Sequence, residues 1–172
     1  MITVSFIPAV FLLFLITSTV TAQPDNLSIS ISFPNQNTDT VREDTQFQAI
    51  ITNTSDEPLR LWETWNSWGW YNLSFEILDD SCNILHTLEK MPRAWTRNFP
   101  SFFVLAAEDQ YAIEVCLNET DWLLPIPGEE YPGGSEAYIR AVFTIPEDEE
   151  TDEYGIWTGR IESEAERFES GL

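Results

Sequence analysis

The stretch Tyr71–Leu88, YNLSFEILDDSCNILHTL, contains two short apolar segments separated by a polar turn. In its first half Leu73, Phe75 and Ile77 alternate with polar or smaller residues, which is the period of a half-buried β-strand. The segment DDSCN supplies turn-forming residues, and ILHTL (84–88) follows as a second strand. The stretch therefore predicts a β-hairpin and an all-β fold.

The same pattern recurs on both sides of this hairpin. Further strands are expected at Leu27–Phe33, Thr45–Asn53, Pro58–Glu63, Phe102–Leu105, Tyr111–Leu117, Ala137–Ile145 and Tyr154–Ile161. Turn-forming residues separate most of these segments, and no window shows a convincing helical period of 3.6 residues. Seven to nine short strands favour an antiparallel immunoglobulin-like β-sandwich, with a closed barrel as the alternative.

Four segments carry a resemblance to a known family: ITNTSDEPL (Ile51–Leu59), LSFEILDD (Leu73–Asp80), AEDQYAIEV (Ala107–Val115) and AYIRAVFTI (Ala137–Ile145). Their order resembles that of the small immunoglobulin-like domains of the bacterial intracellular proteinase inhibitor (BsuPI) type. The resemblance implies an immunoglobulin-like fold and, as a functional alternative, inhibition of a protease. An inhibitor would present an extended loop, for which Glu89–Pro100 and Pro125–Gly134 are the candidates.

The first 22 residues have the composition of a secretory signal. They contain no charged side chain, and their apolar run, Phe6–Ile16, is too short to span a bilayer. Small residues precede a cleavage point after Ala22. The sequence thus predicts a signal peptide over residues 1–22 and a single β-sandwich domain over residues 23–172. The expected location is secreted or periplasmic, with no membrane attachment after cleavage.

The chain is strongly acidic, with 29 Asp and Glu against 8 Lys and Arg and a formal net charge of −21. A field of this sign repels phosphate groups, so neither nucleic acid nor an anionic membrane is an expected partner. The densest run, Glu147–Glu153, falls in a segment, 146–153, that we interpret as a solvated acidic loop. Calcium binding there is an alternative, but the run lacks the spaced ligands and central glycine of a calcium loop. No metal site is predicted.

Two cysteines and one histidine are the other residues that draw attention. An even number of cysteines in an exported chain predicts a disulfide between Cys82 and Cys116, with two separate thiols as the alternative. The histidine, His86, lies in an alternating strand pattern and not beside a nucleophile turn. The chain also lacks a phosphate-binding glycine loop. We therefore expect no catalytic activity and no cofactor.

Four of the seven tryptophans, Trp62, Trp65, Trp68 and Trp70, fall with Tyr71 in the stretch WETWNSWGWY. If residues 68–71 continue into the next strand, Trp68 and Trp70 share its polar face and Tyr71 joins the core face. The indoles then either cap the end of the core or form a partly exposed surface for a glycan or protein ligand. The leading functional hypothesis is an exported, non-catalytic binding or interaction module. A proteinase inhibitor and a structural envelope protein are the alternatives.

Four N-glycosylation sequons begin at Asn26, Asn53, Asn72 and Asn118. They can carry glycans only in a eukaryotic secretory pathway. The resemblance to bacterial domains implies that they are not used.

Overall fold

The computed structural model describes residues 26–33, 40–42, 44, 46–117, 121–123 and 137–169. This part of the chain forms eleven strands: β1 (Leu27–Ser32), β2 (Thr40–Arg42), β3 (Gln46–Asn53), β4 (Leu59–Trp62), β5 (Leu73–Leu78), β6 (Ile84–Leu88), β7 (Phe102–Leu105), β8 (Gln110–Cys116), β9 (Ala137–Ile145), β10 (Gly159–Glu162) and β11 (Glu166–Glu169). Two short helices, α1 (Ser67–Trp70) and α2 (Glu149–Tyr154), complete it. The expected leader (1–22), the loop Pro125–Gly134 and Asn118 lie outside the described residues.

The expectation of an all-β fold is confirmed, and most predicted strands lie within a few residues of their expected positions. The sequence did not predict β2 or β11. Each of these strands buries a single apolar side chain, Val41 in β2 and Phe168 in β11. One apolar residue cannot produce an alternating pattern, so neither segment carried a strand signal.

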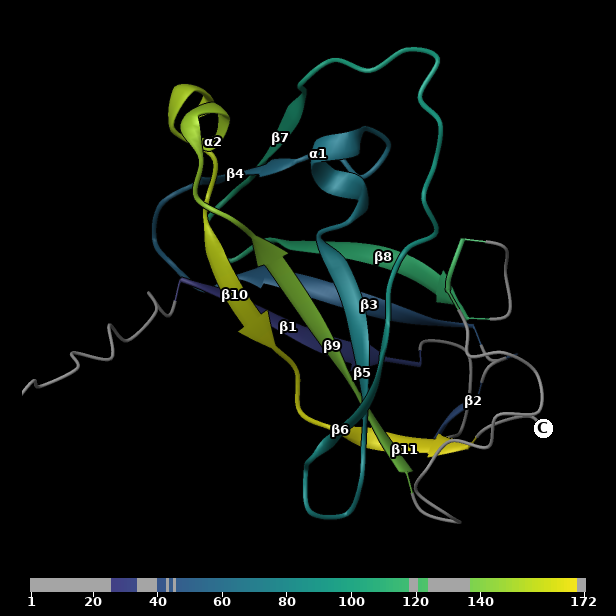
Figure 1. Cartoon of the computed structure of the whole chain (residues 1–172). Coiled ribbons are helices and arrows are strands. Elements are labelled where there is room, and N and C mark those ends of the chain that lie inside the picture. The colour runs from purple at the N-terminus through teal and green to yellow at the C-terminus, as the bar shows by residue number, and fades with distance from the viewer. Residues whose placement is uncertain are drawn as a thin grey trace, which may run out of the picture.

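The strands form two larger sheets and one small one. The three-stranded sheet has the order β1-β3-β8, and the six-stranded sheet has the order β2-β11-β9-β5-β6, with β10 also paired to β9. A separate pair, β4-β7, lies at the end of the molecule where both helices are found (Figure 1). Every described strand pair is antiparallel except β2-β11, which is parallel.

The apolar faces of the two larger sheets meet in the core. Phe47 of β3 contacts Phe75 of β5 edge to face, with ring centroids 5.4 Å apart, and Trp122 contacts the same Phe75 ring at 5.1 Å. The alternation that predicted β3 is preserved, because Phe47, Ala49 and Ile51 are fully buried and the residues between them are only partly buried. In β5 the expected core residues are buried, but Glu76 and Leu78 on the opposite face are buried too. Burial of this apolar surface is the main stabilising contribution.

The acidic segment 146–153 is not a loop, because most of it forms α2. Asp148 caps the helix by accepting a hydrogen bond from the backbone N–H of Thr151, and the Thr151 hydroxyl accepts one from the backbone N–H of Asp148. Acidic residues in the first turn interact favourably with the positive end of the helix dipole. The strand predicted over Tyr154–Ile161 is wrong at its start, because Tyr154 ends α2 and β10 begins only at Gly159. Neither helix of the described part is long and apolar enough to cross a membrane.

The predicted disulfide is also wrong, because Cys82 and Cys116 are not bonded to each other. Cys82 lies in the turn between β5 and β6, in the six-stranded sheet, whereas Cys116 ends β8 at the edge of the three-stranded sheet. Both residues are near strand ends, as expected, but their strands are not neighbours. Proximity in a sheet depends on strand order, which the spacing of cysteines does not reveal.

Candidate functional site

The tryptophan-rich stretch forms a helical turn rather than the start of β5. Asn66 is fully buried and caps α1, because its side-chain oxygen accepts hydrogen bonds from the backbone N–H groups of Trp68 and Gly69, both at 3.0 Å. Its amide nitrogen donates to the carbonyl oxygen of Ser101 at 3.1 Å. Asn66 therefore fixes α1 to the segment that leads into β7.

Gly69 allows α1 to lie directly on the end of β4. A Cβ atom at this position would be 2.2 Å from the carbonyl oxygen of Glu63, which is backbone and cannot turn aside. Only glycine fits this close approach between two backbone segments. The local sequence WNSWGW thus combines a capping residue with a glycine, and these two residues set the position of the flanking indoles.

The helical turn sends the four candidate tryptophans to three different places. Trp62 is buried and contacts the partly buried ring of Trp68 at 6.2 Å between centroids. Trp65 is 46% exposed and contacts Phe99 at 5.3 Å, away from the other indoles. Trp70 faces a third group of residues. The structure therefore brings together only Trp62 and Trp68.

The expected exposures of Trp70 and Tyr71 are both wrong. Trp70 is only 9% exposed, and its indole N–H donates to the carbonyl oxygen of Met91 at 3.0 Å. The Lys90 ammonium lies 4.7 Å and the Arg93 guanidinium carbon 5.0 Å from its ring centroid, which are cation–π distances. Tyr71, expected in the core, is 48% exposed. A strand alternates faces every residue, but a helical turn does not, and this difference reverses the two environments.

A pocket of about 420 Å³ lies between α1 and α2. One wall is formed by Trp62, Trp68, Tyr71 and Asn72, and the other by residues 144–146 at the end of β9 together with Asp148 and Thr151. Figure 1 shows α1 and α2 at the same end of the molecule, beside β4 and β7. The volume falls within the usual range of small-molecule sites. Sequence analysis identified Trp62 and Trp68 as candidates but not Asp148.

Trp68 is held in place from the opposite helix. Its indole N–H donates a hydrogen bond to the carboxylate of Glu150 in α2. The edge of the ring is therefore anchored while the residue still lines the pocket. Such an anchor reduces the side-chain entropy that a ligand would have to remove on binding.

Asn72 is the unusual polar residue of this pocket. It is only 6% exposed, and its side-chain nitrogen has no hydrogen-bond partner among the described residues. Both of its backbone polar groups are hydrogen-bonded: its N–H donates to the carbonyl oxygen of Gly69 at 3.3 Å, and its carbonyl oxygen accepts from the N–H of Thr144 at 2.8 Å. Buried amide donors are nearly always paired, so an unpaired one in a pocket wall requires an explanation. The sequence showed Asn72 only as part of a sequon.

Two of the four sequons are inaccessible in the folded chain. Asn53 is fully buried, and its amide nitrogen donates to the carbonyl oxygens of Glu57, Leu105 and Ala106. The amide of Asn72 is buried in the pocket wall. A glycan on either nitrogen would be incompatible with this packing.

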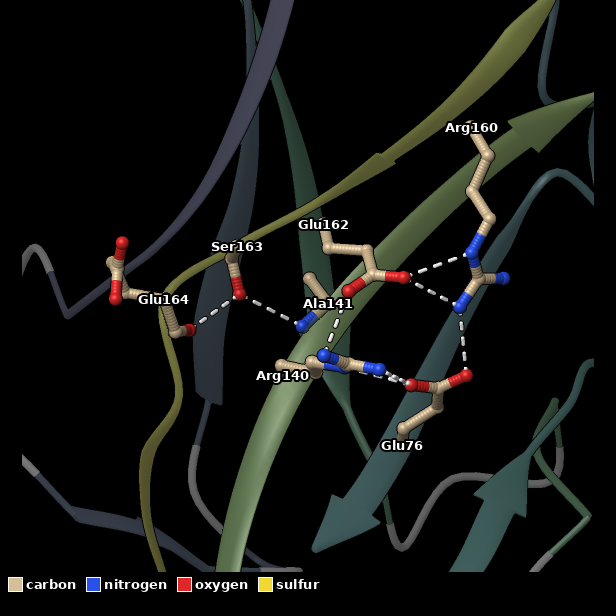
Figure 2. A network of polar contacts seen from close by, with 7 residues as sticks. All are labelled: Glu76, Arg140, Ala141, Arg160, Glu162, Ser163 and Glu164. Atoms are coloured by element: carbon tan, nitrogen blue, oxygen red, sulfur yellow. Dashed lines mark hydrogen bonds and ion pairs between the residues drawn. The ribbon is translucent and has the colours of Figure 1, made fainter. Parts of the chain in front are cut away.

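A second polar cluster lies on the side of the six-stranded sheet that faces away from the core, and it is drawn in Figure 2. The buried carboxylate of Glu76 accepts from Arg140 Nε at 2.7 Å and Arg160 Nη2 at 2.8 Å. Both arginines also pair with Glu162, at 2.7 and 2.9 Å. Each carboxylate is thus bound by two guanidinium groups, which is a structural arrangement and leaves neither acid available for proton transfer.

The surroundings of Glu76 lower its pKa. Burial alone would raise the pKa, but the hydrogen bonds from Arg160 and Arg140 and the attraction of their charges together outweigh it. The carboxylate is therefore ionised at neutral pH and links β5, β9 and β10.

The remaining acidic, thiol and imidazole side chains are dispersed over the described part of the chain. No group of three or more His, Cys, Asp or Glu side chains there is close enough together to hold a metal ion. His86 lies on β6, within the strand predicted for it. In comparisons with known proteins, no protein-family model matches the chain, and no curated protein matches it either.

Proposed function

We propose that the protein is an exported, non-catalytic binding module whose ligand enters the pocket between α1 and α2. The observation that carries the proposal is the pair of indoles, Trp62 and Trp68, that line this pocket beside the buried amide of Asn72. Rigid aromatic rings provide a large contact area at low entropic cost, and a few polar groups fix the orientation of a ligand.

Two polar side chains of the pocket, Ser67 and Asp148, already make structural hydrogen bonds, which supports a non-catalytic role. The Asp148 carboxylate caps α2, and the Ser67 hydroxyl accepts a hydrogen bond from Asn98 at 2.7 Å. Neither group is paired with a base or an acid that would activate it for reaction. These arrangements suit recognition better than proton transfer.

Export and the finer fold assignment belong to the same proposal. The signal-like segment 1–22 supports a secreted or periplasmic location, and N-terminal sequencing of the mature protein should begin at Gln23. Two facing sheets, antiparallel apart from the edge pair β2-β11, support an immunoglobulin-like sandwich related to the BsuPI type. Protease inhibition is the alternative, and backbone hydrogen bonds between Met91 and Asp121 and between Glu89 and Leu123 fix the first part of its candidate loop, 89–100.

A binding screen against panels of glycans and peptides tests the function. Trp68→Ala should abolish binding of any ligand that uses the pocket, and Trp65→Ala is the matched control. Trp65 is an exposed tryptophan three residues away that does not line the pocket. Equal effects of the two substitutions, or recovery of chemically altered ligand after incubation, would refute the proposal.

A further inference from the structure

We infer that the pocket between α1 and α2 binds a neutral sugar unit, with the Asn72 amide donating a hydrogen bond to one of its oxygens. The inference rests on the proposed function and names its ligand class. It depends on three features of the pocket: an unpaired donor, a carboxylate that can accept further hydrogen bonds, and an aromatic wall with no lysine or arginine among the described lining residues.

The donor is the side-chain nitrogen of Asn72. The nitrogen is closed to solvent in the free protein and has no partner within the described part of the chain, so a ligand oxygen would reach it only after the side chain turns toward the pocket that the residue lines. The backbone bonds to Gly69 and Thr144 connect α1 to β9 without using this nitrogen. Leaving an amide donor unpaired costs free energy that a ligand oxygen would recover. The ligand must therefore present an acceptor.

The acceptors lie on the opposite wall. The Asp148 carboxylate is exposed and uses one oxygen to cap α2, whereas an ionised carboxylate can accept about four hydrogen bonds. Groups of this kind bind hydroxyl donors, so the ligand must donate as well as accept.

The aromatic wall and the local charge narrow the choice further. Trp68 offers ring surface, with the buried Trp62 packed against it, and none of the described residues that line the pocket is a lysine or an arginine. Phosphate, sulfate and uronate groups would meet the Asp148 carboxylate without a compensating cation from the lining and are disfavoured. A lysine or quaternary ammonium group would suit the acids and the rings, but it has no acceptor for Asn72. A proline-rich peptide has carbonyl acceptors but few donors for Asp148.

A neutral sugar ring satisfies all of these conditions at once. Its hydroxyl groups both donate and accept hydrogen bonds, and its C–H face packs against an indole. Asn72 would donate to one hydroxyl or ring oxygen, Asp148 would accept from others, and Trp68 would contact the apolar face. No covalent step is involved.

The test uses the purified protein on an array of neutral, uronic-acid, sulfated and amino sugars, together with proline-rich and lysine-rich peptides. Calorimetric titration of the bound compounds then compares the wild type with Asn72→Leu. This variant keeps the branching and the number of heavy atoms of the side chain but removes the donor. We expect binding of neutral glycans, weakened about tenfold by Asn72→Leu, with a melting temperature that is unchanged or higher because a buried unpaired group is gone.

Different results separate the inference from the function on which it rests. Pocket-dependent binding of only charged sugars or peptides, lost in Trp68→Ala, would overturn the sugar assignment and leave the binding function standing. Unchanged neutral-sugar affinity in Asn72→Leu would overturn the role of the Asn72 donor. Absence of any Trp68-dependent ligand would refute the binding function itself. If Asn72→Leu fails to fold, Asn72→Ser provides the same comparison, since its shorter side chain cannot place a donor at the same point.

Discussion

The indole N–H of Trp68 donates a hydrogen bond to the carboxylate of Glu150, which joins α1 to α2 across 82 positions of the sequence. Each residue lies on a short helix with its own cap: Asn66 caps α1, and the Asp148–Thr151 capping box begins α2. One wall of the pocket therefore depends on a contact that neither helix makes by itself.

Replacing Glu150 with Gln should weaken ligand binding severalfold while changing the stability of the fold by about 1 kcal/mol or less, because the bond it loses is exposed. The matched control is Glu149→Gln. Both residues lie in the first turn of α2, so both substitutions remove the same favourable interaction with the helix dipole, but only Glu150 contacts Trp68. Calorimetric titration and thermal melts of the two variants make the comparison. Equal affinities would show that the Trp68 anchor has no role in binding.

Replacing Trp70 with Ala should destabilise the protein by roughly 3 to 5 kcal/mol, the usual cost of truncating a buried tryptophan. Its indole is buried, bonded to the Met91 carbonyl and flanked by Lys90 and Arg93. Urea unfolding measures the change, and Trp65→Ala should cost far less because that ring is half exposed. A Trp70→Ala variant as stable as Trp65→Ala would contradict the buried position of Trp70.

Replacing Gly69 with Ala should displace α1 and impair both stability and binding, because the new methyl group would overlap the Glu63 carbonyl. Gly155→Ala is the comparison. Gly155 has a left-handed backbone with φ of 63°, so alanine there should cost about 1 to 2 kcal/mol from backbone strain. A methyl group would fit there, because the nearest atom, Nη1 of Arg60, lies 3.7 Å from the point that the methyl carbon would occupy, which is an ordinary van der Waals contact. Thermal melts should place Gly69→Ala well below Gly155→Ala, and the reverse order would refute the close contact.

Replacing Glu76 with Gln should destabilise the protein at neutral pH by about 3 kcal/mol, at the lower end for a broken buried ion pair because both arginines are partly exposed. Because the pKa of Glu76 is lowered in the folded state, its stabilising contribution is fully present above the unfolded pKa of about 4.5. The contribution is lost as the pH falls through the folded pKa. Unfolding curves at several pH values should therefore converge for wild type and Glu76→Gln in acid. A difference in stability between the two proteins that persists at low pH would show that the network does not act through its charge. The control is Glu162→Gln, which should lower the free energy of unfolding by less because Glu162 is more exposed than Glu76.

Reduction should leave the melting temperature unchanged, because no bond joins Cys82 to Cys116. Thiol titration under denaturing, non-reducing conditions should find two thiols per chain. In the native protein Cys82 should react readily, since it is exposed in the turn between β5 and β6. A fall in melting temperature on addition of a reductant would contradict this.

The sequence by itself determined the strand content and most strand positions. Alternation of Leu73, Phe75 and Ile77, or of Phe47, Ala49 and Ile51, is a local property, and burial of one face of a strand preserves it in the fold. The signal-like start and the acidic composition are equally local and need no tertiary structure to be recognised.

Only the tertiary structure decided which aromatic residues line a site and which belong to the core. Within residues 62–71 the burial of each ring depends on partners far along the chain: Met91 for Trp70, Phe99 for Trp65 and Glu150 for Trp68. Strand order, in the same way, separated Cys82 from Cys116, and packing left the Asn72 amide buried in a pocket wall. Periodicity describes one segment at a time, whereas these outcomes are set by contacts between segments, which no local pattern encodes.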